Sequence, residues 1–342
     1  MSKKLIFLVT GGSGGHFFPA LSIKERYEND YEFLFLIDKR VSKIIDKNTI
    51  NYVEILPPRY STSTLLFIKN LLKITYSCIK IFSLYQKKRP KVVIGFGGYT
   101  TIFPVIIARL MRIKVIIHEQ NAILGKANRL LKFFSNKVAV SFKKTKFSSK
   151  NAVFTGMPTR CKTNYSNKKI NKFVILVLGG SQGAKFFSEL LPSTLSYFTR
   201  KEINRIYLIQ QCRHEDKIFL EKKLFNLGVN HETANFFTDI HEKILISDLI
   251  ISRCGSSTLA EISLYNKSSF LFPLSSAVDN HQYFNAVEFK KTNDCIIFDE
   301  KKIDYSIFST AIKKRIYYKS NQTKRIKTEN TTKFKKLIDS IT

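Results

Sequence analysis

The sequence predicts an α/β fold made of two similar domains, each built on a parallel sheet. Ten of the fourteen glycines lie in three clusters, and each cluster directly follows an apolar run rich in β-branched residues or leucine. The first and third clusters are near copies, FLVTGGSGG and LVLGGSQGA, with Gly11 and Gly179 lying 168 residues apart in a chain of 342. This spacing, and a usual domain size of roughly 100–200 residues, favour two domains over one large sheet.

The glycine clusters also predict anion-binding loops. The runs LIFLVT (5–10), VVI (92–94) and FVILVL (173–178) are predicted to be the buried strands that precede them. A strand that ends in glycines before a helix lets backbone N–H groups and the helix N-terminus approach a phosphate closely. We therefore expect phosphates to be held at strand ends, in a cleft between the two domains.

The chain is strongly basic, with 57 lysines and arginines against 26 acidic residues and a formal net charge of +31. Such a charge is typical of proteins that bind nucleic acid or an acidic membrane. No RNA-binding or helix-turn-helix signature accompanies the basic residues, which are spread along the chain. Abundant lysine, isoleucine, asparagine and phenylalanine match the pattern expected from AT-rich coding DNA. We therefore expect no nucleic-acid partner.

The cysteine pattern and the apolar runs bound the compartment. The five cysteines are odd in number and show no C-x-x-C spacing, which favours a reduced, cytosolic setting without a zinc site or a disulfide framework. The apolar run Leu5–Val9 is too short for a signal peptide and leads straight into the glycine loop. No uncharged apolar stretch of about 18 residues is present, so we expect a soluble or peripheral protein.

One segment, 65–85, bears on the choice between soluble and peripheral. Its apolar residues recur at helical spacing at Leu65, Ile68, Leu72, Cys78, Ile79 and Phe82. Lysines gather on another face at Lys69, Lys73 and Lys80. Two interpretations stay open: a crossover helix that packs this apolar stripe on a sheet, or a surface that rests on acidic lipid headgroups.

Two polar groups follow predicted strands in the first half of the chain. His16 comes directly after GGSGG, in the first turn of the predicted helix, where a neutral imidazole could take a proton from a hydroxyl. A histidine that only caps the helix is the alternative. His118-Glu119-Gln120-Asn121 ends the run KVIIHEQN and does not match the zinc-binding H-E-x-x-H pattern.

Two polar patches follow predicted strands in the second half. Segment 252–261, SRCGSSTLAE, comes after LIIS, and its hydroxyls and helix N-terminal amides suit phosphate oxygens, while Glu261 could accept both hydroxyls of a ribose. Segment 279–282, DNHQ, comes after FLFPL and offers amide groups suited to sugar hydroxyls. Either patch alone could be a helix cap, but together they indicate a nucleotide-sugar site.

Seven ordered motifs carry a family resemblance: GGSGGHFFPA, GFGGY, HEQNAILGKAN, GMPTR, GGSQGA, SRCGSSTLAE and DNHQYFNA. Over about residues 5–290 the chain resembles the bacterial peptidoglycan N-acetylglucosaminyltransferases of the MurG family. The resemblance implies a GT-B fold, with two Rossmann-like domains facing a cleft. The expected parts are an acceptor and membrane-facing domain at 1–158, a linker at 159–172, a UDP-N-acetylglucosamine-binding domain at 173–305 and a helical segment at 306–342 that returns to the first domain.

The implied reaction moves N-acetylglucosamine, with inversion, from its UDP ester to the C4 hydroxyl of N-acetylmuramoyl-pentapeptide on undecaprenyl diphosphate. The resemblance implies no metal or other cofactor, in agreement with the lack of a D-x-D motif. It also implies a peripheral enzyme of cell-wall synthesis, and so of cell shape and division, at the cytoplasmic face of the plasma membrane. His16 matches the position of a base or acceptor-orienting group, and general base catalysis contributes roughly 10²–10⁴-fold.

The resemblance also assigns the binding residues. Its acceptor contacts fall on Gly97, Gly98 and Tyr99. Its donor contacts fall on Ser13, Gly14, Gly15, Asn121, Arg160, Ser181, Gln182, Thr238, Ser256, Ser257, Thr258, Leu259, Ala260, Glu261 and Gln282, with a backbone contact to uracil near Thr238, after the strand-like NFF.

Departures from the family pattern and rival functions remain. Ser13 stands where threonine is usual, Met157 replaces the asparagine of G-N-P-x-R, and Cys254 replaces a common alanine.

An NAD(P) dehydrogenase would need a third glycine where Phe17 stands. A UDP-N-acetylglucosamine 2-epimerase would share the fold and the donor but needs no acceptor loop. A non-catalytic sugar-nucleotide-binding scaffold is the alternative from another class.

Overall fold

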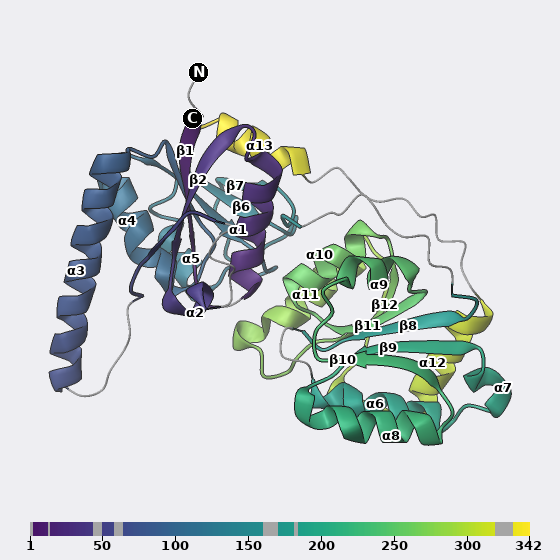
Figure 1. Ribbon diagram of the computed structural model, residues 1–342. Coiled ribbons are helices and arrows are strands. Elements are labelled where there is room, and N and C mark those ends of the chain that lie inside the picture. Colours follow the sequence, from purple (N-terminus) through teal and green to yellow (C-terminus); the bar gives the residue numbers. More distant parts are fainter. Residues whose placement is uncertain are drawn as a thin grey trace. The chain divides into compact units, whose positions relative to one another are not determined.

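The computed structural model describes residues 3–12, 14–43, 50–57, 64–159, 170–180, 184–318 and 331–342. The chain divides into two compact units (Figure 1). Unit 1 is formed by Met1–Arg160 with Glu329–Thr342, and unit 2 by Cys161–Thr328. The carboxyl-terminal part of the chain therefore contributes to both units, since helix α12 (Tyr305–Tyr317) lies in unit 2 and helix α13 (Thr331–Asp339) in unit 1.

Unit 1 contains a parallel sheet of seven strands in the order β3-β2-β1-β4-β5-β6-β7. Its strands are β1 (Lys4–Thr10), β2 (Tyr31–Ile37), β3 (Tyr52–Glu54), β4 (Val92–Gly95), β5 (Lys114–Glu119), β6 (Lys137–Val140) and β7 (Ala152–Phe154). Its other helices are α1 (Gly14–Tyr27), α2 (Lys39–Ser42), α3 (Thr64–Lys88), the 3₁₀ turn η1 (Tyr99–Thr101), α4 (Ile102–Leu110) and α5 (Lys126–Leu131). The chain leaves β1 toward β2 and returns to β4 on the other side, so the topology switches direction between β1 and β4.

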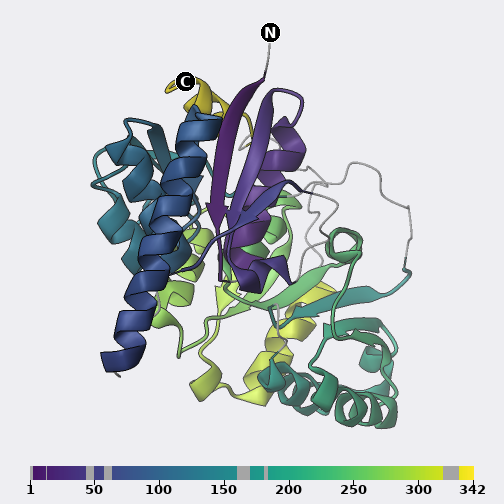
Figure 2. The ribbon, with the colours of Figure 1, turned by 60° about the vertical axis from the view of Figure 1, so that its left-hand side comes forward.

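The central strands of unit 1 are apolar because both faces of the sheet are covered. Ile6 and Leu8 of β1 pack with α1 and with Phe334, Leu337 and Ile338 of α13. Phe7 and Val9 point to the opposite face, where α3, α4 and α5 pack. Side chains of successive strand residues alternate between faces, so one apolar run serves two cores. Figures 1 and 2 show α3 running alongside this sheet and extending past its strands at one end.

Helix α3 confirms the predicted helix but not its predicted buried face. Among the described side chains of α3, Ile81 and Tyr85 are buried in the core against the sheet, and the buried Ser77 hydroxyl bonds the Leu56 backbone. Leu72, Ile79 and Phe82 of the predicted stripe are 67%, 62% and 44% exposed, so the interpretation that this stripe packs on the sheet is wrong. The side chains of Leu65, Ile68 and Lys69 lie outside the described ones. Within the described residues, no helix is long and apolar enough to cross a membrane.

Unit 2 repeats the topology with six strands in the order β10-β9-β8-β11-β12-β13. Its strands are β8 (Phe173–Leu178), β9 (Ile206–Gln211), β10 (Asn230–Ala234), β11 (Leu249–Arg253), β12 (Ser268–Phe272) and β13 (Cys295–Ile297). Its helices before α12 are α6 (Lys185–Leu195), α7 (Arg200–Ile203), α8 (Lys217–Asn226), α9 (Ile240–Ile246), α10 (Ser256–Leu264) and α11 (His281–Lys290), with 3₁₀ turns η2 (His214–Asp216), η3 (Val278–Asn280) and η4 (Glu300–Lys302). The direction here switches between β8 and β11.

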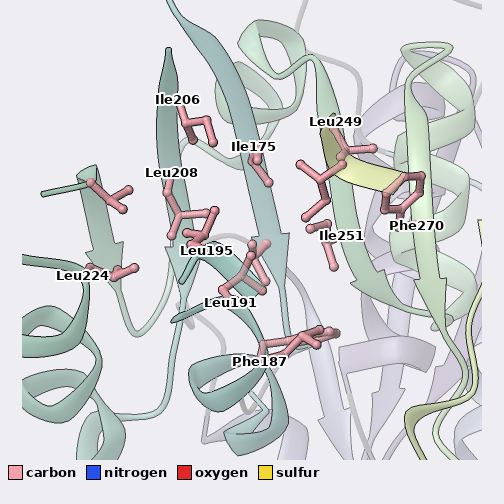
Figure 3. Packing of buried hydrophobic residues seen from close by; sticks show 14 of the residues in the cluster. Ile175, Phe187, Leu191, Leu195, Ile206, Leu208, Leu224, Leu249, Ile251 and Phe270 are labelled. Carbon is pink, nitrogen blue, oxygen red and sulfur yellow. The ribbon is translucent and has the colours of Figure 1, made fainter. Parts of the chain in front are cut away.

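One core of unit 2 lies between its sheet and the helices α6, α8 and α12. Ile175 of β8, Leu208 of β9 and Ile251 of β11 point into it beside Phe187 and Leu191 of α6 (Figure 3). The bounds of β8 match the predicted run FVILVL, because an unbroken apolar segment suits a central parallel strand. In both units, the carboxyl ends of the strands beside the switch point are where ligands bind in doubly wound sheets.

Candidate active site

The loop after β1 requires glycine for two separate reasons. A Cβ at Gly11 would lie 2.2 Å from the Thr100 hydroxyl and 2.7 Å from a carboxylate oxygen of Asp38. Gly12 has a φ of +85°, which residues with side chains rarely adopt. The turn brings the Gly12 N–H to Asp38 Oδ2, to which it donates at 3.0 Å. Helix α1 then starts at Gly14, which places His16 in the first turn as predicted.

Asp38, at the end of β2, joins three loops at this edge of the sheet. Besides Gly12, its buried carboxylate accepts from the Thr100 hydroxyl after β4, at 3.0 Å, and from Arg40 Nη2, at 2.6 Å. Burial raises the pKa of this carboxyl, but the hydrogen bonds and charge of Arg40, with those from Val41 and Thr100, hold it below its ordinary value. The loops after β1, β2 and β4 therefore share one ionised anchor.

The half-buried imidazole of His16 lies where the loops after β1, β4 and β5 converge. Gly97 and Gly98, with φ of +83° and +76°, line one side of this imidazole. A Cβ at Gly97 would lie 3.4 Å from His16 Cε1, and one at Gly98 would lie 3.6 Å from Cδ2. On another side, His16 Nδ1 is 3.3 Å from Gln120 Oε1. Tyr99, the third predicted acceptor residue, is 55% exposed at the start of η1.

The loop after β5 is organised by a second buried carboxylate. Glu119 Oε1 accepts from the backbone N–H and the Nδ2 of Asn121, at 3.0 and 3.1 Å. Its Oε2 accepts from the Gly125 N–H and from Asn128 Nδ2, both at 2.9 Å. Asn121, a predicted donor contact, is therefore held at the strand end directly after Gln120. Unit 1 thus brings His16, Gly97, Gly98 and the Asn121 loop together.

In unit 2, the predicted segment 256–261 forms the first turns of α10, after β11. Gly255 is the N-cap residue and, having no side chain, makes no side-chain cap to the helix. The Ser257 hydroxyl oxygen is buried and has no hydrogen-bond partner among the residues that the structure describes. The N-terminus of a helix beside a hydroxyl group suits an anion such as a diphosphate.

Gln282, in the first turn of α11, links two strand ends of unit 2. Its Oε1 accepts from the Cys254 N–H after β11 and from the Leu274 N–H after β12, both at 3.0 Å. Because the oxygen is held by two backbone donors, the amide NH₂ group is the part that can reach a ligand. Burial raises the pKa of the neighbouring Cys254 thiol far above its ordinary value, so it stays protonated.

Other predicted positions stand as follows. Gly14 and Gly15 open α1, with Gly15 exposed, and Thr258, Leu259, Ala260 and Glu261 lie in α10. Thr238 is exposed in the turn before α9, but the preceding segment 235–237 is not a strand, since β10 ends at Ala234. Met157 is buried, and its sulfur accepts the Ser141 hydroxyl at 3.4 Å. Ser13, Arg160, Ser181 and Gln182 lie outside the described residues.

One organising residue, Asp38, was missed from the sequence, and Gln120 was singled out only as part of the polar group 118–121. Asp38 directly follows the apolar run YEFLFLI, and a polar residue at that position is the signal that could have found it. Within the described part of the chain, His, Cys, Asp and Glu side chains form no group of three that could hold a metal ion.

Comparisons with known proteins agree across both units. Residues 6–140 match the glycosyltransferase family 28 N-terminal domain, and residues 174–341 match the family 28 C-terminal domain. The UDP-N-acetylglucosamine–N-acetylmuramyl-(pentapeptide) pyrophosphoryl-undecaprenol N-acetylglucosamine transferase of Rickettsia felis is 37% identical over 300 residues, which cover 83% of this chain and 82% of the relative.

Solved structures show the same GT-B architecture. MurG of Acinetobacter baumannii superposes with a TM-score of 0.79 at 23% identity, over 98% of this chain and 99% of that one. A UDP-GlcNAc 2-epimerase of Neisseria meningitidis superposes with a TM-score of 0.66 at 14% identity, over 98% and 99% of the two chains. At these identities the likeness concerns the fold alone. The curated relative and the two domain matches establish that the chain belongs to the MurG family of N-acetylglucosamine transferases, within glycosyltransferase family 28.

Proposed function

We propose that this chain transfers N-acetylglucosamine from UDP-N-acetylglucosamine to the C4 hydroxyl of N-acetylmuramoyl-pentapeptide carried on undecaprenyl diphosphate. The observation that carries the proposal is the 37% identity to a curated transferase, over 300 residues that cover 83% of this chain. The site agrees with the assignment, because an imidazole lies at the strand ends of unit 1 and, within the described residues of unit 2, the buried Ser257 hydroxyl has no partner.

The chemistry divides between the two units. The acceptor oxygen attacks the anomeric carbon while the bond to the UDP oxygen breaks, which inverts that centre. We assign to His16 the proton that leaves the acceptor hydroxyl. The N-terminal amides of α10, the Ser257 hydroxyl and the Gln282 NH₂ group would stabilise the charge that develops on UDP. Fixed donors aimed at developing charge are usually the largest single contribution to catalysis.

The test is transfer of labelled N-acetylglucosamine to a short-chain analogue of the lipid-linked muramoyl-pentapeptide, with and without EDTA. We expect acceptor-dependent disaccharide and UDP release that survive chelation. Conversion of the donor to UDP-N-acetylmannosamine without acceptor would instead identify an epimerase. Binding of the UDP-sugar with no turnover under any condition would contradict the transferase and favour the scaffold.

We also propose that α3 attaches the enzyme to the cytoplasmic face of the plasma membrane. Leu72, Tyr76, Ile79 and Phe82 are 67%, 66%, 62% and 44% exposed, and they recur along one face of the helix. Exposed lysines, Lys73 and Lys80, flank this apolar stripe. An apolar stripe between lysines is the pattern of a helix that lies in the interface of an anionic membrane.

Sedimentation with vesicles that contain anionic lipid tests the attachment. The double variant Ile79→Ser with Phe82→Ser should bind vesicles about tenfold more weakly or worse, because it removes apolar area from the interface. The matched control is Phe225→Ser on α8 of unit 2, a residue that is 77% exposed. Equal loss in both variants, or none in the α3 variant, would contradict the assignment to this face.

A further inference from the structure

The buried amide of Gln120 has an orientation that its neighbours determine. Its Nε2 lies 2.8 Å from the backbone oxygen of Phe96, and the side chain is 1% exposed. A carbonyl oxygen only accepts hydrogen bonds, so the amide atom that faces it must be the NH₂ group. The opposite atom of the amide, Oε1, therefore faces His16 Nδ1 at 3.3 Å.

This orientation determines where His16 carries its proton. An amide oxygen only accepts, so His16 Nδ1 must bear the hydrogen in this contact. In a neutral imidazole the second nitrogen, Nε2, then holds the free lone pair. The His16 ring lies beside Gly98, where an added Cβ would come within 3.7 Å of His16 Nε2. Because Gly98 has no side chain, it does not cover this edge of the imidazole. The nitrogen that can take a proton is therefore Nε2.

His118 supports Gln120 from the other side. The Gln120 NH₂ group also lies 3.3 Å from His118 Nδ1, which must accept, so His118 carries its hydrogen on Nε2. That nitrogen is 3.2 Å from the Ser141 hydroxyl, whose hydrogen is directed to the sulfur of Met157. Each contact in the series from His16 to Met157 then has one donor and one acceptor.

The surroundings of His118 keep it neutral, as this arrangement requires. The ring is fully buried, with the rings of Phe96 and of Phe334 from α13 at 5.6 and 5.7 Å. Burial lowers the pKa of His118 to about 3, a hydrogen bond with the Gly156 backbone opposes the shift, and the nearby His16 adds to it. A protonated His118 would place a hydrogen on Nδ1 against the Gln120 NH₂ group.

We propose that Gln120, held by His118 and the Phe96 carbonyl, is a positioning residue that fixes the tautomer of His16 and thereby assigns the base to Nε2. This inference rests on the proposed function, in which His16 takes the acceptor proton. Without the amide oxygen, the imidazole would exchange between its two tautomers, and one of them has a hydrogen on the nitrogen that must accept. Gln120 does not itself need to touch the substrate.

The direct test reads the tautomers in the resting protein. The probe is the long-range proton–nitrogen correlation spectrum of wild-type protein labelled with nitrogen-15 histidine, near pH 7.5 and without substrates. The His16 and His118 signals are assigned by their loss in His16→Ala and His118→Asn. We expect a protonated Nδ1 on His16 and a protonated Nε2 on His118. A protonated Nε2 on neutral His16 would overturn the proposal.

Two substitutions of similar size separate positioning from packing. Gln120→Glu keeps an oxygen toward His16, whereas Gln120→Met fills the space without an acceptor. A positioning role predicts that the Glu variant retains the Nδ1-protonated form of His16 and that the Met variant populates both forms. In the Met variant kcat should fall about tenfold or more while the KM for UDP-N-acetylglucosamine stays within about twofold. Ser141→Ala, which leaves the Gln120 amide intact, should keep the His16 tautomer.

The outcomes remain distinguishable from a failure of the proposed function. If the wild-type protein transfers no sugar, the function fails, and the wild-type spectrum still tests the position of the proton. If Gln120→Met turns over at the wild-type rate, or keeps a single Nδ1-protonated His16, Gln120 does not fix the tautomer. Circular dichroism shows whether each variant is folded. If a variant is not folded, the proton–nitrogen correlation spectrum of the wild-type protein still shows which nitrogen of His16 carries the proton.

Discussion

The two units share a doubly wound topology, but particular polar groups near their strand ends are bonded differently. In unit 1, Asp38 and Gln120 are buried and bonded to other loops of the same unit. In unit 2, the hydroxyl oxygens of Ser252 and Ser257 are buried without a hydrogen-bond partner in the described part of the chain, and Gln282 binds the protein through its oxygen.

The difference indicates two kinds of preorganisation. A buried amide bonded on both sides, as Gln120 is in unit 1, suits a site that must hold one imidazole in one orientation. Unpaired donors suit a ligand that brings its own acceptors, as a diphosphate does. A buried polar group without a partner costs about 1–3 kcal/mol, which a bound ligand can recover. Under the proposed function, unit 1 would take the proton and unit 2 would hold the nucleotide.

Loss of the His16 imidazole should give the largest effect. In His16→Ala we expect kcat to fall roughly 10²–10⁴-fold, because no other described group at this position takes over as base. Steady-state transfer to the lipid-linked acceptor analogue measures it. His214→Ala, at an exposed site in η2 of unit 2, is the matched control and should keep full activity. Equal losses of activity in both variants would contradict the role of His16 as the base.

Lowering the pH should reduce the free energy of unfolding, because His118 is buried in its neutral form. The pKa of His118 is about 3 in the folded chain and about 6.5 when unfolded, so between these values the unfolded state binds a proton that the folded state does not. This contribution is complete above pH 6.5 and is lost as the pH falls. Between pH 7.5 and 5 we expect it to cost about 2 kcal/mol of unfolding free energy.

Denaturation followed by circular dichroism measures that loss, since the chain has no tryptophan. The variant His118→Asn should show a shallower dependence on pH than the wild type. His231→Asn, in β10 of unit 2, should keep the wild-type slope. A parallel loss of stability in His118→Asn and wild type would show that His118 does not cause the dependence on pH.

A smaller effect is expected at Gln282. The variant Gln282→Glu keeps an oxygen for the Cys254 and Leu274 N–H groups but replaces the NH₂ donor with a negatively charged oxygen. We expect unchanged folding and a KM for UDP-N-acetylglucosamine raised about tenfold, which corresponds to about 1.4 kcal/mol. Gln282→Leu removes both functions and should also lower stability. An unchanged KM in the Glu variant would show that the amide only joins the two loops.

Much of the fold could be predicted because the central strands are unbroken apolar runs. Strands β1, β4, β8 and β11 all overlap the predicted runs, and His16 lies in the first turn after its glycines. The buried face of α3 could not be chosen from periodicity, because apolar residues lie on more than one side of this helix. Ile81 and Tyr85 face the sheet while Ile79 and Phe82 do not.

The candidate site was only partly predictable, for a related reason. The glycines and His16 are set by local turn geometry, which a short motif carries. The roles of Asp38 and Gln120 depend on partners brought from other strands, such as Gly12 with Thr100, or His16 with Phe96. A single sequence records each of these residues but not the contact between them.

The most direct test of this division of roles is a calorimetric titration of UDP-N-acetylglucosamine into wild type, His16→Ala and Ser257→Ala. The account predicts that His16→Ala binds the donor within about twofold of wild type while Ser257→Ala binds it about tenfold more weakly. The opposite order, with donor affinity lost at His16 and kept at Ser257, would contradict the assignment of the proton to unit 1 and the nucleotide to unit 2.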